Sequence, residues 1–175
     1  MTAKNDGSEG SRLAFYFAKM LCMYIQLEGL MELKIKRLRE DAKMPVMATK
    51  GAACFDLTAV SIEYLSDTVV KCHTGIAMEI PKGYVGLLFP RSSVYKSGAM
   101  MANGVGVIDS DYRGEVCAIF NILNEKTWFD KGMFNAGDRV CQIMIRKVED
   151  VELREVQELT ETSRGEGAFG STGRA

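Results

Sequence analysis

The sequence predicts a single all-β domain built from short strands. The chain has 175 residues, of which 47% are hydrophobic and 26% are charged, and this length and composition support one ordinary folded core. From residue 31 onward, its apolar runs are about five to eight residues long and end at Gly, Pro, Asn or Asp, which is typical of strands joined by turns. The sequence shows neither alternating strand and helix patterns nor a repeat of fixed period. A doubly wound parallel sheet is therefore disfavoured, and a sandwich or jelly-roll barrel is favoured.

The expected domain begins at Met31, where the strand-like run MELKIKRL starts. The clearest strand covers residues 69–80 and is followed by the turn signal Pro81-Lys82-Gly83. Within the domain, only Ser92–Ser97 has a helical pattern. Further strands are expected over residues 84–89, 105–108, 115–123 and 139–147.

Residues 1–30 form an N-terminal extension whose role the sequence leaves unknown. Leu13–Leu27 is a mostly apolar run that contains Lys19 and Gln26, and about 20 apolar residues are needed to cross a bilayer. Acidic residues before this run and the lack of an A-x-A site after it disfavour a secretory signal peptide. Two interpretations stay open, namely an amphipathic helix docked on the domain and an extension upstream of a natural start at Met31.

The composition disfavours several classes of function. A net charge of −1 does not provide the basic face that binding to a nucleic-acid backbone needs. The single His73 offers no second imidazole for a metal site and makes Ser-His or Cys-His chemistry improbable, so any general base should be a carboxylate. Five cysteines without a C-x-x-C pair disfavour a zinc centre or a disulfide framework and indicate small buried hydrophobes in a reducing compartment. These are Cys22, Cys54, Cys72, Cys117 and Cys141.

The C-terminal stretch from Thr160 to Ala175 is rich in Gly, Ser and Thr and is predicted to be mobile. It matches G-x-G-x-x-G, but the chain ends too soon for the helix and acidic residue of a dinucleotide-binding fold. Closely spaced glycine N–H groups, Arg164, Ser171 and Thr172 suit a phosphate, and Phe169 offers an aromatic face to a base. The alternative is a disordered tail with an incidental aromatic residue.

Two internal segments place polar side chains at the ends of apolar strands. Residues 90–93 (PRSS) combine an arginine and two hydroxyls at a strand-to-helix junction, which predicts an anion site or, alternatively, a serine cap beside a surface arginine. Residues 106–116 (GVIDSDYRGEV) read as a hairpin with Asp109 and Asp111 at its rim. These two aspartates are candidates for acid–base chemistry or ordinary turn residues.

Two more segments bury a polar residue among apolar neighbours. Residues 137–142 (GDRVCQ) place Gln142 in a strand, and residues 51–57 (GAACFDL) place Asp56 between Phe and Leu. Together and in chain order, the five segments resemble the five motifs of the trimeric deoxyuridine triphosphate nucleotidohydrolase (dUTPase) family. The resemblance covers roughly residues 31–175.

This resemblance implies a β-clip or jelly-roll barrel that assembles into a homotrimer with active sites at the subunit interfaces. It divides the chain into the extension 1–30, a core over 31–162 and a flexible arm over 163–175 that closes over the site. The implied reaction converts dUTP and water to dUMP and pyrophosphate with Mg²⁺, which limits uracil incorporation into DNA and supplies dUMP for thymidylate synthesis. The implied location is the cytoplasm, or a host cytoplasm if the chain is viral, with neither a nucleic-acid nor a membrane partner.

The resemblance also implies roles at the catalytic centre and the nucleoside. Asp109 would orient and deprotonate the water that attacks the α-phosphorus, with Gln142 near that water. Tyr112 would pack on the deoxyribose and block a 2′-hydroxyl. Recognition of uracil falls to the hairpin residues Asn103, Val107, Ile108 and Cys117.

Further implied roles concern the phosphates, the metal and the arm. Asp56 would reach the metal through water, and Arg164 would lie near the γ-phosphate. Phe169 would stack on uracil. The remaining phosphate and arm contacts are Arg91, Ser92, Ser93, Gly170, Ser171 and Thr172.

Two departures and two alternatives accompany the resemblance. Cys54 and Ala168 stand where the family more often has glycine. A deoxycytidine triphosphate deaminase of the same fold would have a glutamate where this chain has Ile119. A regulator whose nucleotide binding controls a protein partner is the other alternative, and residues 1–30 are the natural place for that partner.

Overall fold

The structure is a computed structural model that describes Tyr16, residues 31–132 and residues 134–168. Except for Tyr16, the expected helix over Leu13–Leu27 therefore lies outside the described residues. The same holds for the arm residues Phe169, Gly170, Ser171 and Thr172.

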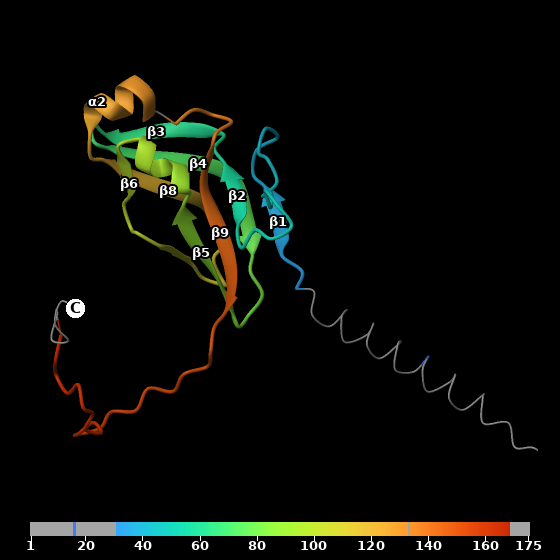
Figure 1. Ribbon diagram of the computed structural model, residues 1–175. Coiled ribbons are helices and arrows are strands. Elements are labelled where there is room, and N and C mark those ends of the chain that lie inside the picture. Colours follow the sequence, from blue (N-terminus) through green and yellow to red (C-terminus); the bar gives the residue numbers. More distant parts are fainter. Residues whose placement is uncertain (1–15, 17–30, 133, 169–175) are drawn as a thin grey trace, which may run out of the picture.

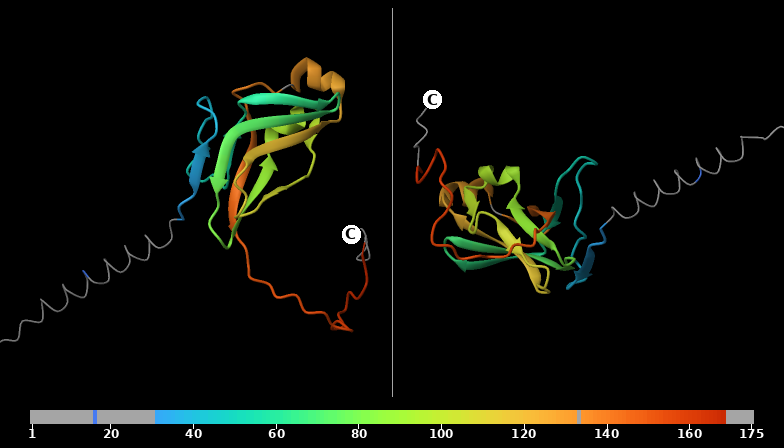
Figure 2. Two further views of the ribbon diagram at one scale, coloured as in Figure 1. Left: turned by 180° about the vertical axis from the view of Figure 1, so that it is seen from behind. Right: turned by 90° about the horizontal axis from the view of Figure 1, so that it is seen from below.

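Two antiparallel sheets pack face to face and form a barrel-like sandwich, which Figures 1 and 2 show from three sides. In the first sheet the order is β1-β4-β8-β6, and β3 pairs with the start of β4. Its strands are β1 (Lys34–Arg37), β3 (Ser61–Ser66), β4 (Val69–Glu79), β6 (Ala99–Met101) and β8 (Glu115–Ile122). In the second sheet the order is β2-β9-β5-β7. Its strands are β2 (Phe55–Thr58), β5 (Tyr84–Pro90), β7 (Gly106–Ile108) and β9 (Arg139–Lys147).

The predicted all-β class is confirmed, and all five predicted strands are present with ends that shift by at most one residue. The helix predicted at Ser92–Ser97 is the short 3₁₀ helix η1 (Ser92–Lys96). Two short helical turns between β8 and β9 were not predicted, because neither is long enough to show a helical period. They are α2 (Glu125–Thr127) and the π-helical turn η2 (Trp128–Gly132).

These two turns close one end of the barrel. The Asn124 side chain accepts a hydrogen bond from the Thr127 backbone N–H at 2.9 Å, which caps α2. Trp128 is fully buried, and its ring meets Phe134 edge-on at 5.1 Å. One large aromatic anchor therefore holds a segment that has little regular structure of its own.

Alternation along β8 decides which side chains reach the core and which face outward. Val116, Ala118, Phe120 and Ile122 are buried between the sheets, as the two-residue period of a strand requires. Glu115 and Cys117 lie on the opposite face and are half-buried. The polar side chains of this strand are thus kept out of the apolar core.

A break in the β4–β8 register lies at Gly75, between His73 and Ala77. Gly75 has φ +66°, and an added Cβ there would lie 2.9 Å from Cβ of Ala42. Its N–H donates to the Glu115 carboxylate at 2.6 Å. Glycine is required here because the backbone is left-handed and a neighbouring segment lies in close contact.

After β9 the chain leaves the barrel as an extended segment, drawn orange to red in Figure 1. No helix or strand is assigned over residues 148–168. Val151, Leu153 and Leu159 are exposed along it, Leu153 by 92%. Among the described residues, no helix is both long and apolar enough to cross a membrane.

Candidate active site

The hairpin between β7 and β8 forms a small pocket whose volume is about 200 Å³. Asp109 follows β7 directly and is exposed at the pocket rim. This space is smaller than the ~300–1,000 Å³ pockets that enclose whole drug-sized ligands, so it suits part of a nucleotide. The lining residues are Val107, Ile108, Asp109, Tyr112, Glu115 and Cys117.

Tyr112 is held against the hairpin by its own hydrogen bonds. Its hydroxyl donates to the Glu115 carbonyl at 3.0 Å, and its N–H donates to the Asp109 carbonyl at 3.2 Å. The ring lies so close to Gly114 that any Cβ there would collide with it. The tyrosine is therefore a fixed wall of the pocket, next to the carboxylate of Asp109.

A second polar cluster lies at the junction of β2, β5 and β9. It consists of Asp56, Arg91 and Arg139, and we call it the arginine cluster. Arg91 donates from Nε to Asp56 at 3.0 Å, and Arg139 donates from Nη1 to the other Asp56 oxygen at 2.9 Å. Arg91 also donates to the Arg139 carbonyl at 3.2 Å. Asp56 is 8% exposed, so two guanidinium groups compensate the cost of burying its charge.

Three other residues that were predicted for the site lie beside the arginine cluster. Gln142 is opposite Asp56 in the β2–β9 ladder, and its Nε2 donates to the Pro90 carbonyl at 3.0 Å. Ser92 and Ser93 open η1 and are exposed. Four of the five sequence segments thus contribute to two clusters, the hairpin pocket and the arginine cluster.

The two clusters lie at opposite ends of β5. Ile108, directly before Asp109, pairs with Gly86 near the start of β5, whereas Arg91 directly follows its end. At about 3.3 Å per residue, roughly 17 Å of strand separates Gly86 from Arg91. Within one chain, Asp109 and the guanidinium held on Asp56 are too far apart to contact the same phosphate group.

Two predicted residues lie in turns. The Asn103 carbonyl accepts the Val105 N–H at 2.6 Å in the tight turn before β7. Arg164 donates from Nε to the Gly167 carbonyl at 3.0 Å, in a turn where Gly165 has φ +50°. Arg164 is exposed, and it belongs to the extended segment that leaves the barrel after β9 in Figure 1.

Two features of this region were not predicted from the sequence. Arg139 lies in the segment 137–142 but was not predicted as a site residue. Its position at the start of a strand, three residues before Gln142, could have indicated such a role. The contact of His73 with Glu115 was also missed. The two ring nitrogens of His73 each lie within hydrogen-bond distance of a carboxylate oxygen, Nδ1 at 2.9 Å from Glu115 and Nε2 at 2.8 Å from Glu63. These two acceptors raise the pKa of the imidazole.

Cys117 lies beside His73 and Glu115. Its Sγ lies 3.7 Å from His73 Nδ1, and burial together with the Glu115 charge raises the pKa of its thiol to about 12. All four cysteines within the described part of the chain are free, and Cys72 and Cys141 are buried. The expectation of small buried thiols therefore holds for these two, while Cys54 and Cys117 are half-buried.

The family model described as dUTPase matches residues 40–173, which is most of the chain and spans both clusters. The chain belongs to the dUTPase family. Two curated dUTPases are similar over nearly their whole length. The deoxyuridine 5′-triphosphate nucleotidohydrolase of Hydrogenobaculum sp. is 41% identical over 146 residues, covering 82% of this chain and 99% of that protein. That of Corynebacterium glutamicum is 39% identical over 156 residues, covering 85% and 99%.

Solved dUTPase structures have the same fold. A variant of the Staphylococcus bacteriophage 80alpha dUTPase with dUpNHpp has a TM-score of 0.70 at 28% identity, covering 83% of this chain and all of that one. A variant dUTPase from phage phi11 of S. aureus, described with a structural Mg(II) ion, has a TM-score of 0.63 at 25% identity. It covers 73% of this chain and 98% of its own. The dUTPase-like barrel expected from the motifs is thereby confirmed.

Proposed function

We propose that this chain is a dUTP diphosphatase, which hydrolyses dUTP to dUMP and pyrophosphate. The observation that carries the proposal is the hairpin pocket, with the exposed carboxylate of Asp109 at its rim and the fixed ring of Tyr112 in its wall. Curated dUTPases align with this chain over nearly their whole length. Such an enzyme limits uracil incorporation into DNA and supplies dUMP for thymidylate synthesis.

In the proposed mechanism, Asp109 accepts a proton from the water that attacks the α-phosphorus. A positioned carboxylate base of this kind contributes about 10²–10⁴-fold to a rate. The backbone of the hairpin, with Asn103, Val107, Ile108 and Cys117, recognises the uracil edge. A different base would leave some of these backbone groups unpaired, so it would bind much more weakly.

Positive charge and donors at the arginine cluster bind the phosphates. Arg91 with Ser92 and Ser93 contacts phosphate oxygens, and Gln142 lies near the attacking water. Because a triphosphate is highly anionic, fixed donors stabilise the charge that develops in the transition state. Arg164, Phe169, Gly170, Ser171 and Thr172 then close over the nucleotide and exclude water.

The side chains of this site fit a magnesium ion that the nucleotide carries. Mg²⁺ prefers oxygen ligands, keeps several waters, and often takes one or two carboxylates plus substrate phosphates. Asp56 is the carboxylate of the arginine cluster, and two arginines already neutralise it, which favours a contact through water. Mg²⁺ bound in this way neutralises phosphate charge.

We also propose that the site is completed in a homotrimer. The separation of Asp109 and Arg91 along β5 supports an active site shared between chains. Aliphatic side chains after β9, including Val151 and Leu153, are exposed among the described residues of one chain, and contact with a neighbouring chain would remove this apolar surface from water. The same proposal divides the chain into the extension 1–30, the core 31–162 and the arm 163–175. It also includes a cytoplasmic location.

A nucleotide panel tests the proposed function. Purified protein is incubated with Mg²⁺ and dUTP, dCTP, dTTP or UTP, and both pyrophosphate and ammonia are measured. We expect pyrophosphate from dUTP alone and no ammonia. Ammonia from dCTP would show the deaminase, although Ile119 occupies the position expected for its glutamate. Nucleotide binding without turnover would show the regulatory alternative.

A further inference from the structure

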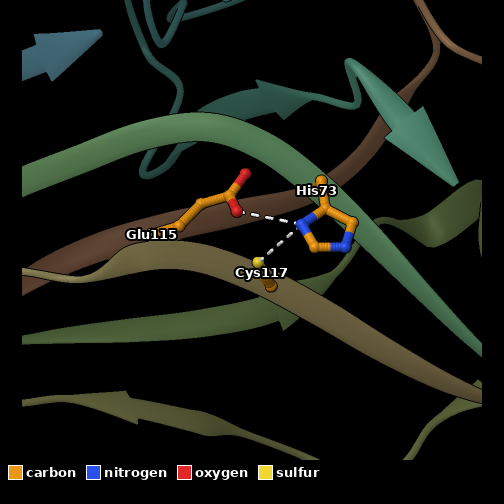
Figure 3. Close-up of side chains that lie close together, drawn as sticks. All are labelled: His73, Glu115 and Cys117. Atoms are coloured by element: carbon orange, nitrogen blue, oxygen red, sulfur yellow. Dashed lines mark hydrogen bonds and ion pairs between the residues drawn. The ribbon is translucent and has the colours of Figure 1, made fainter. Parts of the chain in front are cut away.

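Three different metal-binding side chains meet beside the hairpin pocket. His73 on β4 lies directly opposite Cys117 on β8, and Glu115 is two residues earlier on the same face of β8. One nitrogen, one sulfur and one carboxylate oxygen from these residues lie within 4.8 Å of one another (Figure 3). In the part of the chain that the structure describes, no other group of His, Cys, Asp or Glu is arranged in this way.

We propose that His73, Glu115 and Cys117 bind one Zn²⁺ ion per chain. We call these three residues the His73 cluster. Zinc accepts nitrogen, sulfur and oxygen ligands together, usually in tetrahedral geometry. The proposal is independent of the proposed hydrolysis and concerns a different ion, because Mg²⁺ prefers an all-oxygen environment.

The distances fit a tetrahedral ion after a small adjustment. Bond lengths of about 2.05 Å to nitrogen and 2.3 Å to sulfur place those two ligand atoms about 3.6 Å apart. In the structure, His73 Nδ1 and Cys117 Sγ are 3.7 Å apart. The same geometry places nitrogen and oxygen about 3.4 Å apart, whereas His73 Nδ1 and Glu115 Oε2 are 2.9 Å apart. The nitrogen–oxygen pair therefore has to open by about half an ångström, and the sulfur and oxygen ligand atoms already lie within 4.8 Å of each other.

Hydrogen bonds from neighbouring residues orient two of the three ligands, His73 and Glu115. The second ring nitrogen of His73 lies 2.8 Å from the Glu63 carboxylate, which directs Nδ1 toward the other two ligands. The second oxygen of Glu115 accepts the Gly75 N–H at 2.6 Å. Carboxylate partners of a ligating histidine and hydrogen bonds to a ligating carboxylate are general features of metal sites.

The paired strands hold the ligands in place without an ion. In the metal-free protein, His73 Nδ1 and the Glu115 carboxylate lie 2.9 Å apart, within hydrogen-bond distance, and a metal would replace any proton between them. Three protein ligands leave one coordination position for water or another small ligand. Glu115 and Cys117 also line the hairpin pocket, so the site adjoins the proposed nucleobase site.

Titration with Co²⁺ tests the site in the full-length, metal-free protein without nucleotide. Cobalt(II) substitutes for zinc, and a thiolate ligand gives it an intense near-ultraviolet charge-transfer band. We expect one Co²⁺ per chain, with this band, and its displacement by Zn²⁺. In Cys117→Ser the band should disappear, and in Cys54→Ser, the matched thiol control, it should remain.

A second pair of variants keeps the test valid if Cys117→Ser folds poorly. Glu63 is half-exposed and supports the ligand without touching the metal, so Glu63→Gln should weaken Co²⁺ binding about 10- to 100-fold. Glu79→Gln, the control on the exposed Lys34 pair, should leave the affinity unchanged. Absence of the band in the unaltered protein, its persistence in Cys117→Ser, or equal affinities for the two glutamine variants would overturn the proposal.

Discussion

At the scale of single residues, Asp109 is the side chain on which the proposed chemistry depends most. It is exposed at the pocket rim, so it can reach a water without first breaking a buried ion pair. The buried Asp56, by contrast, is held by two arginines. The structure thus distinguishes an exposed carboxylate, Asp109, from a buried one that two guanidinium groups already hold.

We predict that Asp109→Asn lowers kcat for dUTP by about 10²–10⁴-fold, because an amide cannot accept the proton. KM should change much less, since the side chain keeps its size and place. Steady-state pyrophosphate release measures both constants. Asp111→Asn is the matched control in the same turn and should retain most of the activity; if the two variants behave alike, Asp109 is not the base.

Tyr112 offers a test of sugar selection. Replacing its ring in Tyr112→Ala should reduce the preference for dUTP over UTP, measured as the ratio of kcat/KM values, by roughly 10²-fold. Tyr112→Phe keeps the ring and loses only the hydrogen bond to the Glu115 carbonyl, so the preference should persist while stability falls by about 0.5–1.5 kcal/mol. A Tyr112→Ala enzyme that still rejects UTP would remove the ring from this role.

At the scale of elements, the sequence predicted five strands to within one residue at each end, but it did not predict β2, β3 or β6, and it predicted the connections poorly. Arg139–Lys147 has the predicted ends because its apolar run is long and bounded by a Gly-Asp turn. The turn around Trp128 was missed because tertiary packing against Phe134, not local periodicity, holds it. The break at Gly75 was also invisible, since it exists only relative to the partner strand β8.

We predict that Gly75→Ala lowers the free energy of unfolding by about 2–4 kcal/mol. A left-handed backbone costs an alanine about 1–2 kcal/mol, and the contact with Ala42 adds an overpacking cost. Gly83→Ala is the control, because Gly83 has φ +82° but open space around it, and it should cost only about 1–2 kcal/mol. Denaturant unfolding at one protein concentration compares them, and equal losses would exclude the packing contribution.

At the scale of the whole molecule, the separation of the two clusters has consequences for assembly. One chain carries both a hairpin pocket and an arginine cluster but holds them at opposite ends of β5. A closed ring of three chains can bring the pocket of one chain to the arginine cluster of the next.

Hybrid trimers test this arrangement. Asp109→Asn and Arg91→Gln chains with different affinity tags are co-expressed, and trimers carrying both tags are purified. If each site takes Asp109 from one chain and Arg91 from its neighbour, every mixed trimer has one intact site, so activity should return to about one third of the unaltered enzyme. Sites built within one chain would leave the hybrids as inactive as the parent variants.

Removal of the arm tests closure. We predict that truncation after Ser163 lowers kcat by roughly 10²-fold, because the nucleotide loses its cover and its alignment, while the protein remains a trimer. Removing only Arg174 and Ala175, which follow the glycine-rich segment, is the control and should have little effect. Light scattering and dUTP turnover measure the two properties, and full activity after the longer truncation would exclude the arm from the mechanism.

The sequence by itself determined the all-β class and the order of the five motif segments, and it predicts a carboxylate as the general base. These follow from local periodicity, turn residues and the presence of a single histidine, all of which are properties of neighbouring residues along the chain. Tertiary structure alone decided that Asp109 and Arg91 lie apart, that Arg139 shares Asp56, and that His73 meets Glu115 and Cys117. The physical reason is that strand pairing joins residues about 40 or more positions apart, and their register depends on the whole sheet.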